Sequence, residues 1–264
     1  MTPVALTIAG SDPSGGAGIQ ADLKTFHQHG VYGESVVTLL TVQNTRTVAG
    51  IEFVAPAFVA AQIGAVVSDI PPHAAKTGAL GRADIIEAVA DRARGFAFPL
   101  VVDPVMISKH GLPLLADDAV DALVARLLPH AALVTPNLPE AARLTGLSVD
   151  EVSDGAAGME RAARAIHAMG ARAVLVKGGH LAGSAMDLLL ADGRVTVFEG
   201  SRIESTHTHG TGCTLAAAIT ARLARGDALE AAVAGARAFV RAAIATAPKL
   251  GGGCGPVNHF APIA

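Results

Sequence analysis

Short apolar runs alternate along the chain with longer segments of helical periodicity. The apolar runs are bounded by Gly, Pro, Asp or Asn and predict strands over residues 4–9, 35–41, 74–77, 100–103, 132–135, 173–177, 185–190 and 195–199. The longer segments predict helices over residues 18–28, 57–67, 83–93, 117–128, 139–144, 159–169, 212–224 and 229–245. This order predicts an α/β fold in which helices cover both faces of a mostly parallel central sheet.

The alternation continues without a break, so we expect residues 1–264 to form a single doubly wound domain. No charge run, low-complexity linker or fixed-period repeat marks a domain boundary. Asp192 and Gly193, between the last two predicted strands, are typical of a hairpin turn. The chain is 51% hydrophobic and can bury a large core without metals or disulfides.

Charge and cysteine content narrow the class of partner. The formal net charge is −3 with no run of Lys or Arg, so neither a nucleic acid nor an anionic membrane is expected, and a small ligand is favoured. Cys213 and Cys254 do not form a disulfide framework, which favours the reducing cytoplasm. The apolar run within residues 1–8 is too short for a signal peptide core or a membrane span and predicts a buried strand.

A first glycine-rich segment, residues 11–18, follows a predicted strand and precedes a predicted helix. Open α/β sheets bind ligands beyond the carboxyl ends of their strands, and glycines there let the backbone approach a ligand closely. The segment matches neither the P-loop pattern nor the dinucleotide fingerprint. A tight strand-to-helix turn explains it equally well.

A second glycine-rich segment, residues 208–214, opens the predicted helix over 212–224. Backbone amides at a helix start stabilise the charge of a phosphate or of a phosphoryl group in transfer. The same helix dipole would stabilise a Cys213 thiolate, which could accept a proton from a substrate hydroxyl. The alternative is that Cys213 is a small buried hydrophobic residue. His207 and His209 are interpreted as polar loop residues, because no histidine shows metal-ligand spacing.

Polar residues also follow three later strands. Asn137 and Glu140 would lie on one face of a helix start, where they could orient a hydrated Mg²⁺, although the local sequence favours a simple helix cap. Lys177 ends a strand and could reach phosphate oxygens, or else face solvent. Asp103 could face a metal or a substrate amine, or else be a turn residue.

Taken together, these segments resemble the hydroxymethylpyrimidine/phosphomethylpyrimidine kinases of the ribokinase-like superfamily. The resemblance spans nearly the whole chain, and its ordered blocks are more specific than any single motif. The matching blocks are residues 7–12, 15–25, 43–45, 76–78, 103–106, 135–141, 177–180 and 208–214.

The resemblance implies transfer of the γ-phosphoryl group of Mg²⁺-ATP to 4-amino-5-hydroxymethyl-2-methylpyrimidine, and then to its monophosphate, in thiamin biosynthesis. The family's pyrimidine-binding glutamine matches Gln43, whose amide both donates to and accepts from an aminopyrimidine edge. Further substrate-binding residues expected from the resemblance are Gly10, Asp12, Ala17, Asp22, Ala79 and Val105.

The resemblance also implies catalytic roles and an assembly. Cys213 stands where the superfamily commonly has an aspartate base, and Gly210, Thr211 and Gly212 would supply anion-stabilising amides. Relatives of this family suggest a homodimer. The residues expected to bind ATP and magnesium are Asp103, Asn137, Glu140 and Lys177, with Mg²⁺ held by Asn137 and Glu140, directly or through water.

Two departures and several alternatives accompany this interpretation. Ala79 stands where several relatives have a methionine lining the pyrimidine pocket, and His207 where the family often has asparagine. The nearest alternative is a pyridoxal or pyridoxine kinase of the same superfamily. A non-catalytic descendant that binds the pyrimidine or a nucleotide is a second, and a dehydrogenase is a weaker third.

Overall fold

The computed structural model describes residues 2–107, 111, 115–179 and 185–263. In this part of the chain the strands form one nine-stranded sheet in the order β3-β2-β1-β4-β5-β6-β7-β8-β9. The strands are β1 (Val4–Ser11), β2 (Tyr32–Gln43), β3 (Val48–Phe53), β4 (Ala74–Thr77), β5 (Leu100–Val102), β6 (Leu133–Val134), β7 (Ala173–Gly178), β8 (Met186–Ala191) and β9 (Arg194–Phe198). The chain therefore forms the single-domain α/β fold expected from its sequence.

The six central strands, from β2 through β1, β4, β5 and β6 to β7, run parallel. The antiparallel neighbours lie at the two edges, where β3 pairs with β2, and β8 and β9 follow β7. Because the central strands are parallel, their carboxyl ends all open on one edge of the sheet. The loops that follow these ends build the site described below.

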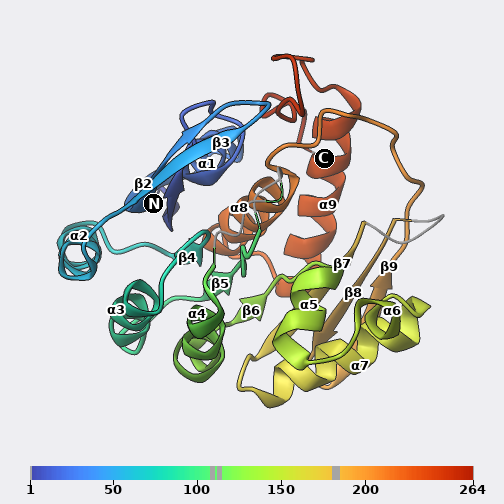
Figure 1. The fold of residues 1–264 in the computed structure, drawn as a ribbon, viewed down its shortest axis with the longest axis horizontal. Helices are drawn as coiled ribbons and strands as arrows, with labels where there is room; N and C mark the ends of the chain where they lie inside the picture. The colour runs from blue at the N-terminus through green and yellow to red at the C-terminus, as the bar shows by residue number, and fades with distance from the viewer. Residues whose placement is uncertain (1, 108–110, 112–114, 180–184, 264) are drawn as a thin grey trace.

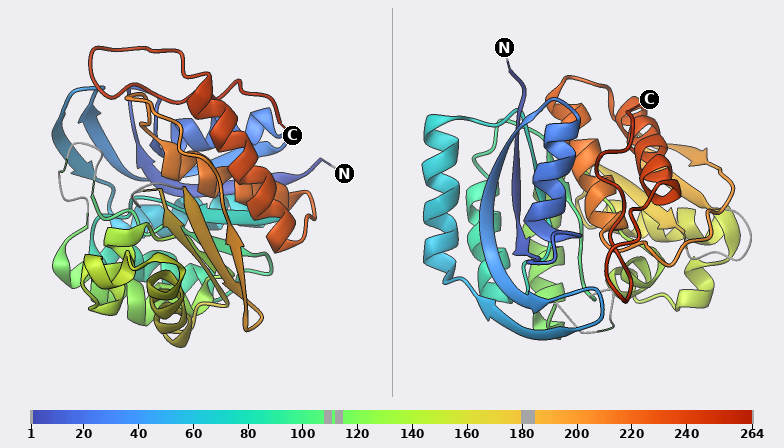
Figure 2. Two further views of the ribbon diagram at one scale, coloured as in Figure 1. Left: turned by 90° about the vertical axis from the view of Figure 1, so that its right-hand side faces the viewer. Right: turned by 90° about the horizontal axis from the view of Figure 1, so that it is seen from above.

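Helices pack against both faces of the sheet (Figures 1 and 2). One face carries α1 (Gly18–Gln28), α8 (Thr211–Ala224) and α9 (Leu229–Ala245), which pack against one another. The other carries α2 (Pro56–Asp69), α3 (Ala83–Ala93), α4 (Asp117–Ala122), α5 (Leu138–Thr145), the short α6 (Val149–Val152) and α7 (Gly155–Ala168). Two apolar layers result, one on each side of the strands.

The buried strands explain why the sequence forms this sheet. All four residues of β4 are buried, and so are the first seven of β1, which fits central strands covered on both faces. Helix α8 is rich in alanine, and its small side chains allow close packing on β1, β4 and β5. The described residues include no helix of sufficient length and apolarity to span a bilayer.

Four features differ from the sequence predictions. The edge strand β3 and the short helix α6 were not predicted, and β2 extends from Tyr32 to Gln43 where 35–41 was expected. The predicted helix over 117–128 is only partly α-helical, because it changes to a π-helical turn over Leu123–Leu127 and a 3₁₀ turn over Leu128–His130. Asp192 and Gly193 both have positive φ, as a hairpin turn requires, so that prediction is confirmed.

Candidate active site

A large cleft of about 1390 Å³ runs along the carboxyl ends of the parallel strands. Every residue predicted to belong to the site, except Asp22, borders this cleft. Its lining includes Gln43, Ala79 and Val105, the loop of residues 201–208, and side chains of α9. The start of helix α8 lies between Gln43 and Lys177, because Gln43 lies 3.2 Å from His209 and a Cβ on Gly212 would lie 3.4 Å from Lys177 Nζ.

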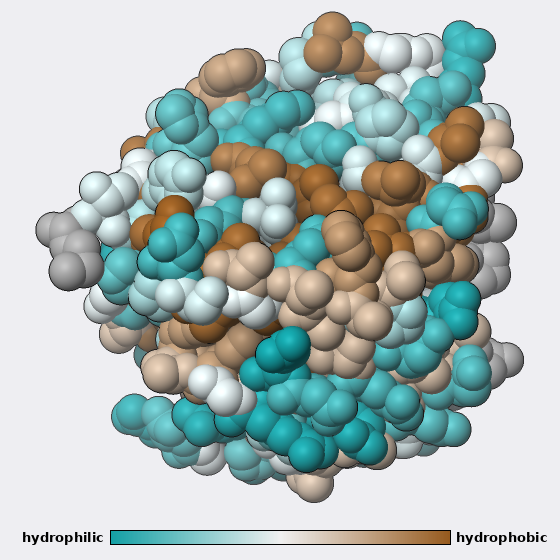
Figure 3. Space-filling view, turned by 90° about the vertical axis from the view of Figure 1, so that its left-hand side faces the viewer, coloured by the Kyte–Doolittle hydropathy of each residue, from teal (hydrophilic) through white to brown (hydrophobic). Residues whose placement is uncertain are grey.

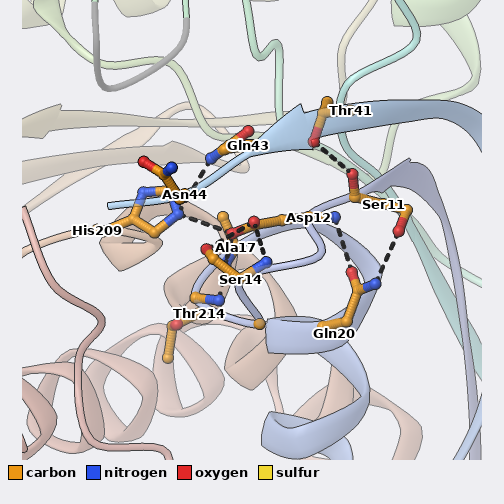
Figure 4. A network of polar contacts seen from close by, with 12 residues as sticks. Ser11, Asp12, Ser14, Ala17, Gln20, Thr41, Gln43, Asn44, His209 and Thr214 are labelled. Carbon is orange, nitrogen blue, oxygen red and sulfur yellow. Dashed lines mark hydrogen bonds and ion pairs between the residues drawn. The ribbon is translucent and has the colours of Figure 1, made fainter. Parts of the chain in front are cut away.

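The first glycine-rich segment is held in shape by Asp12 (Figure 4). Its carboxylate accepts hydrogen bonds from the backbone N–H groups of Ser14 at 2.9 Å, Gly16 at 3.2 Å and Ala17 at 2.8 Å. Burial opposes ionisation of this carboxyl, but the hydrogen bonds from His209 and Ser14 outweigh it and lower its pKa. Asp12 borders the cleft, yet in this structure its charge is used to order the loop.

His209 joins the two glycine-rich segments. Its Nε2 lies 2.7 Å from Asp12 Oδ2, and the amide nitrogen of Gln43 lies 3.2 Å from the same Nε2 (Figure 4). The ring is almost fully buried. The sequence interpretation of His209 as a polar loop residue is therefore wrong. Its position inside the segment 208–214 was the signal that could have identified it.

The second glycine-rich segment packs directly on the first. Gly210 is the N-cap of α8 with φ of 80°, a left-handed conformation that favours glycine. A Cβ added to Gly210 would collide with the carbonyl oxygen of Gly16. A Cβ on Gly212 would lie 3.4 Å from Lys177 Nζ, an ordinary contact distance. The amides that open α8 are thus fixed between the first loop and a cationic side chain.

Cys213 lies in the first turn of α8 and borders the cleft. Burial raises the pKa of its thiol to about 11, although the nearby ammonium of Lys76 opposes this increase and the backbone N–H of Gly18 donates toward the sulfur. This cost of burial opposes the thiolate that the start of α8 was expected to stabilise, so the role of Cys213 as a proton acceptor stays a prediction.

A second cluster of charges lies after β5 and β7. Lys177 Nζ is 2.9 Å from Asp103 Oδ1 and 3.9 Å from Glu140 Oε2. Thr135 donates a further hydrogen bond to Asp103. Burial raises the pKa of Glu140 to about 7, although the Lys177 ammonium opposes it. The carboxylates outweigh burial at Lys177 and raise its pKa, so the lysine stays charged.

Asn137 and Glu140 form a complete capping box at the start of α5. The side chain of Asn137 accepts from the Glu140 N–H at 2.9 Å, and Glu140 Oε2 accepts from the Asn137 N–H at 2.8 Å. The helix cap favoured by the local sequence is therefore confirmed. Among the described residues no group of three or more His, Cys, Asp or Glu could hold a metal ion. The nearby oxygen donors fit a hydrated Mg²⁺ rather than a dedicated protein cage.

Asp22 does not belong to the surface of the cleft. It is fully buried on α1, where its Oδ2 accepts from Lys76 Nζ at 2.9 Å and from Thr7 Oγ1 at 2.6 Å. The prediction that Asp22 contacts the substrate is therefore wrong, because helix α1 directs this side chain into the protein. Lys76 itself borders the cleft, although its exposed fraction is 0%.

Three predicted features remain, namely Ala79, His207 and the block over residues 177–180. Ala79 borders the cleft, and its carbonyl accepts a hydrogen bond from Thr38. His207 borders the cleft as well. His180, the last residue of the block over 177–180, lies outside the described residues.

Comparisons with known proteins give the family. The sequence matches the family model described as phosphomethylpyrimidine kinase over residues 12–258. A hydroxymethylpyrimidine/phosphomethylpyrimidine kinase of Rhizobium meliloti is 52% identical over 263 residues, which cover 98% of each chain. The thiamine biosynthesis bifunctional protein ThiED of Geobacter sulfurreducens is also 52% identical, over 97% of this chain, but this chain spans only 52% of that protein.

Solved structures agree with the fold. An ADP complex of Bacillus subtilis pyridoxal kinase aligns with a TM-score of 0.88 at 37% identity, covering 99% of this chain and 98% of that one. A phosphomethylpyrimidine kinase of Clostridium difficile aligns with a TM-score of 0.78 at 41% identity, covering 91% and 98%. With the match over residues 12–258, these similarities show that the chain belongs to the phosphomethylpyrimidine kinase family.

Proposed function

We propose that this chain is an ATP-dependent kinase of thiamin biosynthesis that phosphorylates 4-amino-5-hydroxymethyl-2-methylpyrimidine and then its monophosphate. The names of its relatives, which reach 52% identity over almost their full length, support this reaction. The observation that carries the proposal is the cleft itself. Gln43 borders it on one side and Lys177 on the other, and the start of α8 lies between them.

The acceptor is assigned to the side of the cleft that holds Gln43. The Gln43 amide offers a donor and an acceptor to the aminopyrimidine edge. Gly10, Ala17, Ala79 and Val105 border the same side and would enclose the ring. Asp12 orders the adjacent loop and holds His209 beside Gln43. This arrangement would place the hydroxymethyl group toward Cys213.

The nucleotide is assigned to the side that holds Lys177. Lys177 would contact the phosphates, and the amides of Gly210, Thr211 and Gly212 would stabilise charge on the phosphoryl group. Asp103, Asn137 and Glu140 would orient the water shell of Mg²⁺, which supplies charge neutralisation when bound. Cys213 would accept the proton of the acceptor hydroxyl, provided that its sulfur is ionised in the reacting complex.

The direct test measures ATP consumption with the pyrimidine, with its monophosphate and with neither. We expect turnover with both acceptors, and the pyrophosphate as the product of the second step. Failure to consume ATP with either acceptor would contradict the proposal. ATP binding without turnover, measured by calorimetry, would favour the non-catalytic alternative.

A pyridoxal kinase is the second candidate, because an observation favours it. The pyridoxal kinase of B. subtilis aligns with a higher TM-score than the phosphomethylpyrimidine kinase of C. difficile, 0.88 against 0.78. Pyridoxal also carries a hydroxymethyl group on an aromatic ring. The same assay with pyridoxal and pyridoxine distinguishes the two, since turnover of the pyrimidine monophosphate is expected only of the first candidate.

We also propose that the chain forms a homodimer in the cytoplasm. Strand β2, next to the edge strand β3, carries the exposed apolar side chains Tyr32, Leu40 and Val42, and Figure 3 shows apolar surface on this side of the molecule. Two free cysteines fit a reducing compartment. Light scattering coupled to gel filtration tests the assembly, and a monomer at micromolar concentration would contradict it.

A further inference from the structure

We propose that Lys76, held in place by Asp22, is the buried cation that stabilises the thiolate of Cys213. This inference rests on the proposed kinase function, in which Cys213 accepts the proton of the substrate hydroxyl. It answers the difficulty that the sulfur lies in a buried setting, where an anion is costly. Lys76 would act through Cys213 and would need no contact with the substrate.

Lys76 occupies a fixed position in the protein interior, on the strand β4 that packs against α8. It lies on β4, opposite Thr7 in the register of β1, and helix α8 packs on both strands. Its Nζ is 2.9 Å from Asp22 Oδ2, and neither side chain has exposed surface. Asp22 Oδ2 also accepts from Thr7 at 2.6 Å, so α1, β1 and β4 together fix the pair. The cation therefore has little freedom to move.

The ammonium has hydrogen-bonding capacity left over. A lysine ammonium has three N–H donors, and Asp22 Oδ2 is the one acceptor found for it within the described part of the chain. The Nζ lies 3.3 Å from the position that a Cβ on Gly78 would occupy, and both residues border the cleft. The unused donors are therefore close to the cleft that Cys213 borders.

A structural role alone explains this pair poorly. Removing two charges from water costs several kcal/mol for each ion, and apolar residues of similar size would pack a sheet interior at least as well. Asp22 Oδ1 is also buried without a hydrogen-bond partner among the described residues. The pair is better explained if the active site requires the positive charge of Lys76.

Cys213 lies within the electrostatic reach of four charged side chains. Lys76 and Lys177 are the cations, and Asp22 and Asp103 are the carboxylates. Lys177 is already engaged by two carboxylates, Asp103 at 2.9 Å and Glu140 at 3.9 Å. Lys76 has one within ion-pair distance, Asp22, while Asp103 acts on it from farther away. Lys76 is also the leading favourable influence on the thiolate, ahead of the Gly18 N–H. Lys76 is thus the cation whose charge is less completely neutralised.

The chemical step balances with Lys76 unchanged. The acceptor hydroxyl gives its proton to the Cys213 thiolate, its oxygen forms a bond to the γ-phosphorus of ATP, and the bond to the bridging oxygen of ADP breaks. Cys213 leaves the step as a thiol and returns its proton to solvent after product release. The Lys76 ammonium offsets the negative charge before this transfer.

The test measures ionisation of Cys213 without substrates. In a Cys254→Ser background, which removes the other thiol, the rate of iodoacetamide alkylation is followed from about pH 6 to 10.5, because only the thiolate reacts. We expect Lys76→Met to slow alkylation about tenfold at pH 8, which corresponds to an increase of about one unit in the thiol pKa. Lys24→Met, at an exposed lysine on the same helix as Asp22, should leave the profile unchanged.

The variant Lys76→Met/Asp22→Asn guards against misfolding, because it leaves no unpaired charge in the interior. It also removes the Asp22 carboxylate, which raises the Cys213 pKa, so alkylation should be faster than in Lys76→Met but still slower than in the Cys254→Ser parent. The kcat should fall with little change in the KM of the pyrimidine. A folded double variant whose alkylation profile matches the Cys254→Ser parent overturns the proposal. If the parent itself alkylates as expected but consumes no ATP, the kinase function fails and the link between Lys76 and Cys213 stands.

Discussion

Two buried lysine–aspartate pairs act electrostatically on Cys213, and they have the same length but different surroundings. Lys76 and Asp22 are 2.9 Å apart with 0% of either side chain exposed. Lys177 and Asp103 are also 2.9 Å apart, but 14% of the Lys177 side chain is exposed. The first pair is sealed between α1 and the sheet, and the second opens into the cleft.

The difference shows that solvent access and charge balance, rather than distance, separate the roles of the two pairs. Around Lys177 a second carboxylate, Glu140, adds negative charge, and burial raises its pKa to about 7. This excess of negative charge around Lys177 suits a ligand that brings a cation together with its phosphates. Lys76 has a single carboxylate and no exposed surface, which suits a fixed charge beneath a reacting group.

The largest effect is expected at the residue between the pairs. Cys213→Ala should reduce kcat by about a thousandfold, the usual scale for loss of a positioned proton acceptor, while the Kd of the pyrimidine changes little. Steady-state kinetics and calorimetry measure the two quantities. Cys254→Ala is the matched control, because its thiol does not border the cleft, and it should keep full activity. Equal activity of the two variants would remove Cys213 from catalysis.

The second effect separates the two lysines. Lys177→Met should reduce kcat by about a hundredfold and raise the KM of ATP, because it removes a charge that contacts the phosphates. Lys76→Met should lower kcat without changing the KM of ATP. Initial rates over a matrix of both substrates measure these constants. The same change in the KM of ATP for both variants would show that the two pairs do not have separate roles.

The layout of the sheet was largely predictable from the sequence, and the reason lies in the buried strands. Almost all residues of β1 and β4 are buried, and the local sequence of each was enough to predict a strand. Strand β3 was missed because none of its residues is fully buried and it includes Gly50 and Glu52. Its existence depends on pairing with β2, which local sequence does not encode.

The residues bordering the cleft were predictable from their motifs, but their contacts were not. Asp12 and His209 are 197 positions apart in sequence, and only the packing of the two glycine-rich segments brings them together. Asp22 stands in a matching block, yet helix packing directs it to Lys76 and away from the cleft. Burial also opposes ionisation of Cys213, and burial is a property of the folded chain.

A third effect compares two glycines at the start of α8. Gly210→Ala should cost at least about 2 kcal/mol of stability, because the left-handed conformation is unfavourable for alanine, and the new methyl group also meets the carbonyl oxygen of Gly16. Gly212→Ala should change stability by less than about 1 kcal/mol, since alanine favours helices, and its methyl group meets Lys177 Nζ at 3.4 Å and Asp103 Oδ2 at 3.9 Å, both ordinary contacts. Urea unfolding measures both, and similar losses would contradict the assigned packing.

The smallest effect concerns Glu34, a buried carboxyl with no ion pair among the described residues. Burial raises its pKa from 4.5 to about 7, with a contribution from the carboxylate of Asp69, and its Oε2 has no hydrogen-bond partner among the described residues. Between these two pH values the folded chain holds a proton that the unfolded chain has released, so stability falls as pH rises through this window. Above about pH 7 the whole penalty is present.

Glu34→Gln should therefore stabilise the protein by about 1–2 kcal/mol at pH 8 and have almost no effect at pH 4.5. Urea unfolding at the two pH values measures the difference, and kcat should not change because Glu34 lies outside the cleft. Asp69→Asn is the matched control and should give a smaller gain, since Asp69 contributes less than burial. An equal gain at both pH values would mean that packing is responsible. A gain confined to the higher pH would show what an unpaired buried charge costs, and hence why both lysines of the site keep a carboxylate beside them.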